Sequence, residues 1–299
     1  MILWITGISR IDSFFIFRSG FFYARPEGEN TMNTQKKNSL LTIGEDLHIL
    51  NNRFQQAVDS RDEHSLIALA DQQIKGGAKA LDINLGPSKS MAARLMWVME
   101  TIQSQWDIPL FLPAGGNLEK ALQLHQGKAT INAVTADPKR LDPVITLARD
   151  YNANLVVLLT KPGLWTAGNQ QQLQLALNVL ERSDAIGLPL DNLYLDPVFS
   201  VRTDPMTWNL SGGMPDLDRV LELISFIGEL TDQRAGTILA LSNGTLGLPA
   251  HKRSALHCRM LPLLIEAGLR AVILNCRDNA LMKVARSLDT ASRTCRKAA

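Results

Sequence analysis

The feature that most constrains the fold is a regular alternation of short apolar runs with longer segments of helical periodicity, beginning near residue 40. Each run has about six residues, is rich in Leu, Ile and Val, and is apolar on both faces, as in parallel strands covered on both sides. The eight predicted strands are Leu40–Asp46, Ala80–Gly86, Pro109–Ala114, Thr130–Thr135, Leu155–Thr160, Leu193–Phe199, Thr237–Asn243 and Ala271–Arg277.

Eight strand–helix units of about 32 residues predict a (β/α)8 barrel, an α/β TIM barrel formed by a single domain. An open, doubly wound sheet is the alternative, but its usual marker, GxGxxG after the first strand, is missing. The segments between strands have apolar residues three and four positions apart, and Gly76-Gly77, Gly187 and Gly268 follow three of them as expected helix caps. We expect the barrel to span residues 40–290 and a C-terminal tail to span 291–299.

The N-terminal residues 1–39 differ from the rest of the chain. Seven of the 17 aromatic residues fall within the first 23 positions. Arg10, Asp12 and Arg18 interrupt this apolar run, which disfavours a secretory signal. We expect an N-terminal extension that is disordered or not native, with translation starting at Met32; a membrane-surface anchor is the alternative.

Charge and composition limit the classes of partner. The chain has 31 Lys and Arg against 29 Asp and Glu, a formal net charge of +2, and this balance disfavours nucleic acid as a partner. No apolar run reaches the roughly 18 residues that span a bilayer, so we expect no membrane partner. Three cysteines and five histidines show no metal-ligand spacing. We therefore expect a cytoplasmic protein without a bound metal.

Polar side chains mark the C-terminal ends of the predicted strands, where a barrel of this kind places its chemistry. Carboxylates and carboxamides dominate, and their paired acceptors and donors suit a flat, nitrogen-rich heterocycle. A phosphate site would favour clustered cations, of which this rim offers Lys161, Arg253 and Arg277. Each acid or amide alone is commonly a helix cap or turn residue. The set comprises Glu45, Asp82, Asn84, Asn132, Asp196, Asn243 and Asn275.

Read in order, the strand ends resemble those of the pterin-binding barrels. The similarity is greatest to the methyltetrahydrofolate:corrinoid/iron–sulfur protein methyltransferases, and more distant to dihydropteroate synthases and the folate domain of cobalamin-dependent methionine synthase. It covers about residues 40–290 and rests on the ordered set rather than on one motif. The motifs are Ile43-Gly44-Glu45, Ala80-Leu81-Asp82-Ile83-Asn84-Leu85-Gly86-Pro87, Ile131-Asn132, Leu193-Tyr194-Leu195-Asp196-Pro197 and Leu241-Ser242-Asn243.

The resemblance implies which residues contact a pterin. Asp196 and Asn132 would bond its amino-pyrimidine edge, with Asn84 nearby, and Asn243 would lie beside N5 as the catalytic residue. Arg253 matches an arginine that the family carries near the ligand. The pterin-binding set that follows from the resemblance is Glu45, Asp82, Asn84, Asn132, Asp196, Asn243 and Arg253.

The resemblance also implies a reaction and partners. Methyltetrahydrofolate would donate its N5-methyl group to the cobalt of cobalamin, or another corrinoid, carried by a separate partner protein. Family members are often dimers, so a homodimer is expected. A tertiary amine is a poor leaving group, so N5 must gain a proton or a strong hydrogen bond as the methyl departs.

One segment departs from the family pattern. Leu112-Pro113-Ala114-Gly115-Gly116-Asn117 stands where the family has a carboxylate at the end of the third strand. Losing one charge-assisted hydrogen bond costs about 1.5–3 kcal/mol, or about 10- to 150-fold in binding. A catalytically silent pterin- or partner-binding barrel is therefore one alternative. A dihydropteroate synthase-like enzyme is another, although Ser242-Asn243-Gly244-Thr245 stands where that family carries a lysine.

Overall fold

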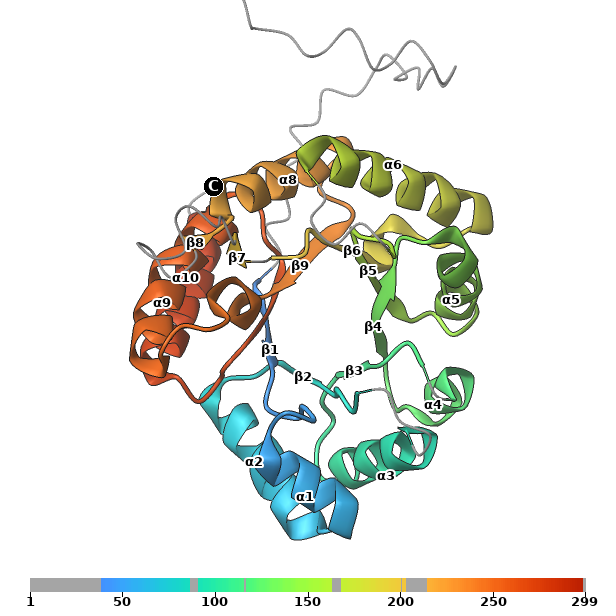
Figure 1. Ribbon diagram of the computed structural model, residues 1–299, viewed down its shortest axis with the longest axis vertical. Helices are drawn as coiled ribbons and strands as arrows, with labels where there is room; N and C mark the ends of the chain where they lie inside the picture. Colours follow the sequence, from blue (N-terminus) through green and yellow to red (C-terminus); the bar gives the residue numbers. More distant parts are fainter. Residues whose placement is uncertain are drawn as a thin grey trace, which may run out of the picture. The chain divides into compact units, whose positions relative to one another are not determined.

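The computed structural model describes residues 39–86, 91–115, 117–162, 168–199, 201–202 and 214–297. Eight parallel strands close into a barrel in the order β1-β10-β9-β6-β5-β4-β3-β2 (Figure 1), which confirms the predicted TIM barrel. The predicted N-terminal extension lies, up to residue 38, outside the described residues. The barrel strands are β1 (Leu41–Gly44), β2 (Ala80–Asp82), β3 (Leu110–Leu112), β4 (Thr130–Thr135), β5 (Asn154–Leu158), β6 (Leu193–Asp196), β9 (Gly236–Ala240) and β10 (Ala271–Leu274).

Helices form the outer layer around the strands (Figure 1). No helix among the described residues is long and apolar enough to cross a membrane. The helices are α1 (Asn52–Ser60), α2 (Glu63–Gly76), α3 (Met91–Gln103), α4 (Leu118–Leu124), α5 (Pro138–Asp150), α6 (Asn169–Ile186), α8 (Leu217–Leu230), α9 (Ala250–Glu266) and α10 (Asn279–Lys297), with 3-10 turns η3 (Leu190–Asn192) and η4 (Leu241–Thr245).

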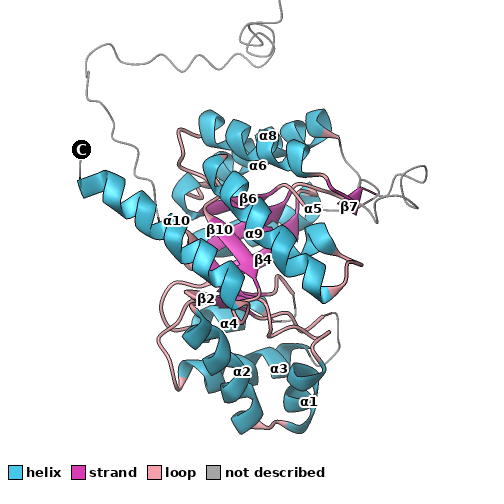
Figure 2. Cartoon of the chain, turned by 90° about the vertical axis from the view of Figure 1, so that its left-hand side faces the viewer, coloured by secondary structure: helices cyan, strands magenta, loops and turns pink. Residues whose placement is uncertain are grey.

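Three details differ from the sequence-based expectation. The connection between β1 and β2 contains two helices, because Asp62 caps the second by accepting a bond from Ser65 N at 3.1 Å. A two-stranded antiparallel ladder, β7 (Val201–Arg202) and β8 (Met214–Pro215), follows β6. Helix α10 continues to Lys297 and so includes most of the segment predicted to be a tail; it lies beside α9 on the outside of the barrel (Figure 2).

Two apolar layers explain why the strands read as apolar on both faces. The smaller layer fills the barrel interior, and the larger one lies between strands and helices. Side chains alternate along a strand, so a residue two positions after an interior residue also points inward. The interior layer consists of Ile43, Ala80, Phe111, Val156, Ile238, Ala271 and Ile273.

Substitution of Gly76 tests the packing of α2 against the barrel. A Cβ at Gly76 would lie 2.1 Å from the carbonyl oxygen of Cys276, a backbone atom that cannot rotate away. We expect Gly76→Ala to lower the free energy of unfolding by about 1–3 kcal/mol, measured by urea denaturation. At Gly168 a Cβ would meet nothing within 4 Å, so Gly168→Ala should cost less than about 1 kcal/mol. Equal losses would contradict this account.

Candidate functional site

Three acidic side chains point toward one end of the barrel. Glu45 lies two residues after Ile43, and Asp82 lies two residues after Ala80, so the strand alternation that buries these apolar residues turns both acids inward. Asp196 ends β6 and, like Asp82, is only 8% exposed. The structure therefore brings together three of the predicted pterin-binding residues at the C-terminal ends of the strands.

A hydrogen bond links two further positions of the predicted set. Asn132 Nδ2, on β4, donates to Asp82 Oδ1, on β2, at 2.8 Å. Strand β3 lies between β2 and β4. The bond therefore spans β3, whose end lacks the carboxylate expected from the resemblance, so the acid of β2 and the amide of β4 form a pair across that position.

Burial dominates the charge state of Asp82. It raises the pKa of this carboxyl from 3.8 to about 6, while the Asn132 bond acts to lower the pKa and the nearby Glu45 to raise it. The side chain consequently holds its proton much closer to neutral pH than an exposed aspartate does.

This shift predicts how stability depends on pH. Because the folded-state pKa of about 6 exceeds the 3.8 of an ordinary aspartate, the contribution of Asp82 to stability is fully present below about pH 4 and is lost as the pH rises through 6. Asp82→Asn keeps an acceptor for Asn132 but does not titrate. From pH 4 to 7.5, the unfolding free energy of the wild type should fall relative to that of the variant by about 2–3 kcal/mol. Denaturant titrations across this range measure the difference; a constant difference would contradict the assignment.

Glu45 connects the first strand to the segment after β9. Burial raises the pKa of its half-buried carboxyl, a hydrogen bond from the Ser242 side chain lowers it, Asp46 raises it, and Arg253 and Arg277 lower it. Ser242 lies next to Asn243 in η4. Glu45 therefore fixes the residue adjacent to the predicted catalytic amide.

Asp196 is the most strongly perturbed acid of the group. Burial raises its pKa from 3.8 to about 7, whereas a hydrogen bond from the backbone N–H of Val198 and the charge of Arg219 act to lower it. The Val198 N–H donates to Asp196 Oδ1 at 2.7 Å. One carboxyl oxygen is thus oriented by the protein's own backbone.

Asn243 lies in a different element from the one predicted. The sequence places it at the end of a strand, whereas the strand stops at Ala240 and Asn243 is exposed in the 3-10 turn η4. That turn is held by Thr245, whose Oγ1 lies 2.8 Å from Nε2 of the buried His257 on α9. The exposed amide of Asn243 is therefore carried by a turn whose residues Ser242 and Thr245 bond Glu45 and His257.

The structure shows Asn84 as a turn residue and Arg253 as an exposed residue of α9. The backbone of Asn84 pairs with the loop after β1, through Asn84 N to Leu47 O at 2.9 Å and Ile49 N to Asn84 O at 2.8 Å. Its Oδ1 accepts a bond from Gly86 N at 3.2 Å, as a turn residue does. Arg253 is exposed on α9, close enough to lower the pKa of Glu45.

Sequence reasoning missed several residues that hold the site. The Ser242 side chain bonds Glu45, and His257 bonds Thr245 in the turn that carries Asn243. No local motif signals either contact, because the partners lie more than ten positions apart. Arg219 and Gln172 are further examples, since they bind backbone carbonyls of the loop after β6. Among the described residues, no group of three or more His, Cys, Asp or Glu is arranged to hold a metal ion.

Three solved structures with a similar fold are dihydropteroate synthases. The Clostridium difficile enzyme, solved in the presence of pteroic acid, has 16% identity and a TM-score of 0.60 over 85% of this chain and 97% of that chain. The Xanthomonas albilineans enzyme in complex with 7,8-dihydropteroate has 14% identity and a TM-score of 0.59, covering 86% and 94%. The Stenotrophomonas maltophilia enzyme with active-site-bound imidazole has 14% identity and a TM-score of 0.61, covering 86% and 94%.

These similarities establish the fold that this chain shares with dihydropteroate synthases. No family model matches the chain. The reaction therefore has to be argued from the side chains at the C-terminal end of the barrel.

Proposed function

We propose that this protein binds a reduced pterin at the C-terminal end of its barrel and transfers the N5-methyl group of methyltetrahydrofolate, or a related methyl-pterin, to the cobalt of a corrinoid protein. The observation that carries the proposal is the gathering of Asp196 and the hydrogen-bonded pair Asp82–Asn132 on inward faces of one barrel end. The fold shared with enzymes solved with pteroic acid and 7,8-dihydropteroate supports the pterin part.

The donor set fits a pterin. Its amino-pyrimidine edge presents parallel N–H groups, and an ionised carboxylate accepts two such bonds. Asp196 supplies that carboxylate, with Oδ1 already oriented by the Val198 N–H. Asn132 donates to Asp82 while its amide oxygen can accept. Acceptors and a donor are thus provided by the alternate strands β2, β4 and β6.

The chemical step needs a group at the pterin N5. As the methyl leaves, negative charge develops on this nitrogen unless it gains a proton or hydrogen bond. The exposed amide of Asn243 can donate a bond that strengthens as the charge develops, which stabilises the transition state more than the ground state. Glu45, through Ser242, fixes the turn that carries this amide. The cobalt that accepts the methyl belongs to the corrinoid of the partner protein.

Dihydropteroate synthesis is the second candidate, favoured by the structural neighbours. Its pyrophosphate leaving group calls for cations at this end of the barrel. Of the rim cations, Arg277 is paired with Asp46 at 2.6 Å, whereas Lys161 and Arg253 are exposed. The turn η4 offers Ser242 and Asn243 where the dihydropteroate synthases carry a lysine. The uncharged side chains of η4, in the place of a lysine, favour methyl transfer over pyrophosphate release. A silent pterin-binding barrel is the third, suggested by the altered end of β3.

The partners and location belong to the same proposal. A corrinoid protein would dock over the C-terminal end of the barrel, because the cobalt has to reach the N5-methyl group. A homodimer and a cytoplasmic location stay predictions from the sequence.

Calorimetry and absorbance separate the candidates. Methyltetrahydrofolate is titrated into the protein, and methylation of cob(I)alamin is then followed by its spectrum. Binding with turnover supports methyl transfer, and binding without turnover supports the silent barrel. A parallel assay for dihydropteroate formation tests the second candidate. If methyltetrahydrofolate does not bind, both methyl transfer and the silent pterin-binding barrel are removed.

A further inference from the structure

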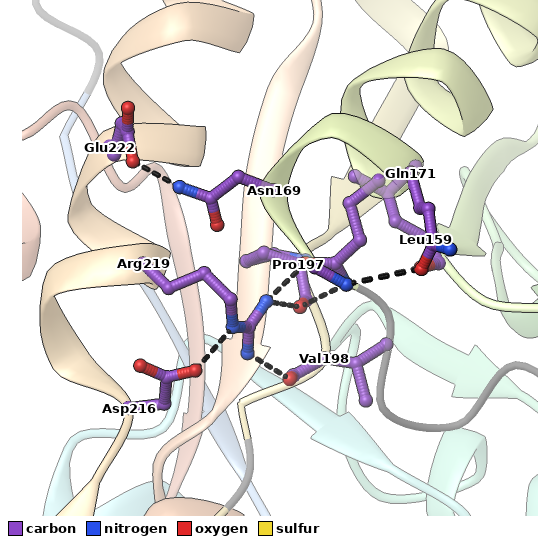
Figure 3. A network of polar contacts seen from close by, with 10 residues as sticks. Leu159, Asn169, Gln171, Pro197, Val198, Asp216, Arg219 and Glu222 are labelled. Atoms are coloured by element: carbon purple, nitrogen blue, oxygen red, sulfur yellow. Dashed lines mark hydrogen bonds and ion pairs between the residues drawn. The ribbon is translucent and has the colours of Figure 1, made fainter.

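Arg219, near the start of α8, is tied to the loop that follows β6 (Figure 3). Its side chain is only 12% exposed. Nη1 donates to the carbonyl of Pro197 and Nη2 to the carbonyl of Val198, each at 3.0 Å, while Nε bonds Asp216 Oδ2 at 2.8 Å. The planar guanidinium therefore holds two consecutive carbonyls immediately after Asp196, a geometry that a lysine cannot reproduce.

Gln172 of α6 completes this network. Its Nε2 donates to the carbonyls of Leu159, at 3.1 Å, and Pro197, at 2.8 Å, and its Oε1 accepts a bond from Arg219. Gln172 is buried. The network therefore joins the ends of β5 and β6 to the helices that cover them, and it satisfies carbonyls that would otherwise be buried without partners.

The held segment has a conformation that valine seldom adopts. Val198 has φ of +54°, in the left-handed region that is unfavourable for a β-branched residue. Such a conformation persists only where the surroundings fix it. In this conformation the Val198 N–H donates to Asp196 Oδ1 at 2.7 Å, while the Val198 carbonyl accepts from Arg219. One residue thus links the arginine to the carboxyl.

We propose that Arg219 is a positioning residue for the pterin site, which holds the Pro197–Val198 turn so that the Asp196 carboxylate is oriented and ionised for the ligand. The inference rests on the proposed function, because it takes Asp196 as the acceptor for the pterin edge. It adds a residue outside the predicted set, which acts through the backbone rather than by touching the ligand.

Among the described residues, Arg219 is the charged group that acts on the carboxyl of Asp196. Strand β5 pairs Leu158 with Asp196, and β9, on the other side, contributes Ile238 near this level; neither side chain titrates. From α6 comes the neutral Gln172, and from α8 come Arg219 and its partner Asp216. Burial raises the pKa of Asp196 to about 7, and Arg219 acts in the opposite direction.

The test replaces Arg219 and follows Asp196 in the free protein. In Arg219→Gln, the pKa of the Asp196 carboxyl, measured by carbon NMR, should rise by about one unit or more. If Asp196 must be ionised, the pH midpoint of methyltetrahydrofolate binding should rise equally, with a loss of affinity of about fivefold at pH 7. Arg234→Gln, which removes an exposed ion pair with Asp191, is the control and should change neither value.

A second variant keeps the charge but removes the two-pronged contact. Arg219→Lys should weaken methyltetrahydrofolate binding about tenfold above pH 8, where Asp196 is ionised in both proteins, because the turn is no longer held. An unchanged pKa and midpoint in Arg219→Gln, or an unchanged affinity in Arg219→Lys, would overturn the inference. If the wild-type protein binds no pterin, the proposed function fails, while the NMR measurement still decides whether Arg219 controls Asp196.

Discussion

Asp196→Asn is expected to weaken binding of methyltetrahydrofolate about 100-fold. The carboxylate accepts N–H groups of the pterin, whereas an amide turns a donor toward one of them and leaves polar groups unpaired around a residue that is only 8% exposed. A loss of about 3 kcal/mol corresponds to this factor. Calorimetry at pH 8, where the wild-type carboxyl is ionised, measures it.

A matched control lies just before the same strand. Asp191 precedes β6, at the opposite end from Asp196, and forms an exposed ion pair with Arg234 at 2.9 Å. Asp191→Asn should therefore leave the affinity within twofold of the wild type. An unchanged affinity in Asp196→Asn would show that the pterin does not use this carboxylate.

Asn243→Ala is expected to lower the rate constant of methyl transfer about 100- to 1000-fold while changing the dissociation constant of methyltetrahydrofolate less than tenfold. The amide bond to N5 strengthens only as the methyl departs, so its loss falls on the transition state. Single-turnover methylation of cob(I)alamin measures the rate constant, and calorimetry measures the binding.

The pattern of effects distinguishes the role of Asn243. Asn178→Ala serves as the control, because Asn178 is exposed on α6 and its Oδ1 accepts a hydrogen bond from Gln174 of the same helix. If Asn243→Ala weakens binding and leaves the rate constant intact, the residue holds the ligand and does not assist the chemistry.

The candidate site was predictable in part. Glu45, Asp82 and Asp196 could be placed at one barrel end because the count of strands fixes the closure and the two-residue alternation fixes which side chains face inward. Asn243 could be placed at the correct strand, but not in a 3-10 turn, since the run from Thr237 to Asn243 is apolar enough to read as one strand.

The amino-acid sequence alone determined the barrel and the chemical type of its rim, because hydrophobic periodicity is a local property of the chain. Only the tertiary structure decided which rim groups bond one another. The Asn132–Asp82 bond joins residues 50 positions apart, and Arg219 reaches the Val198 carbonyl from 21 positions away. The charge states of the acids also depend on burial among distant strands, which raises the pKa of Asp196 to about 7. Such contacts depend on how separate elements pack, and a local pattern of residues carries no record of that packing.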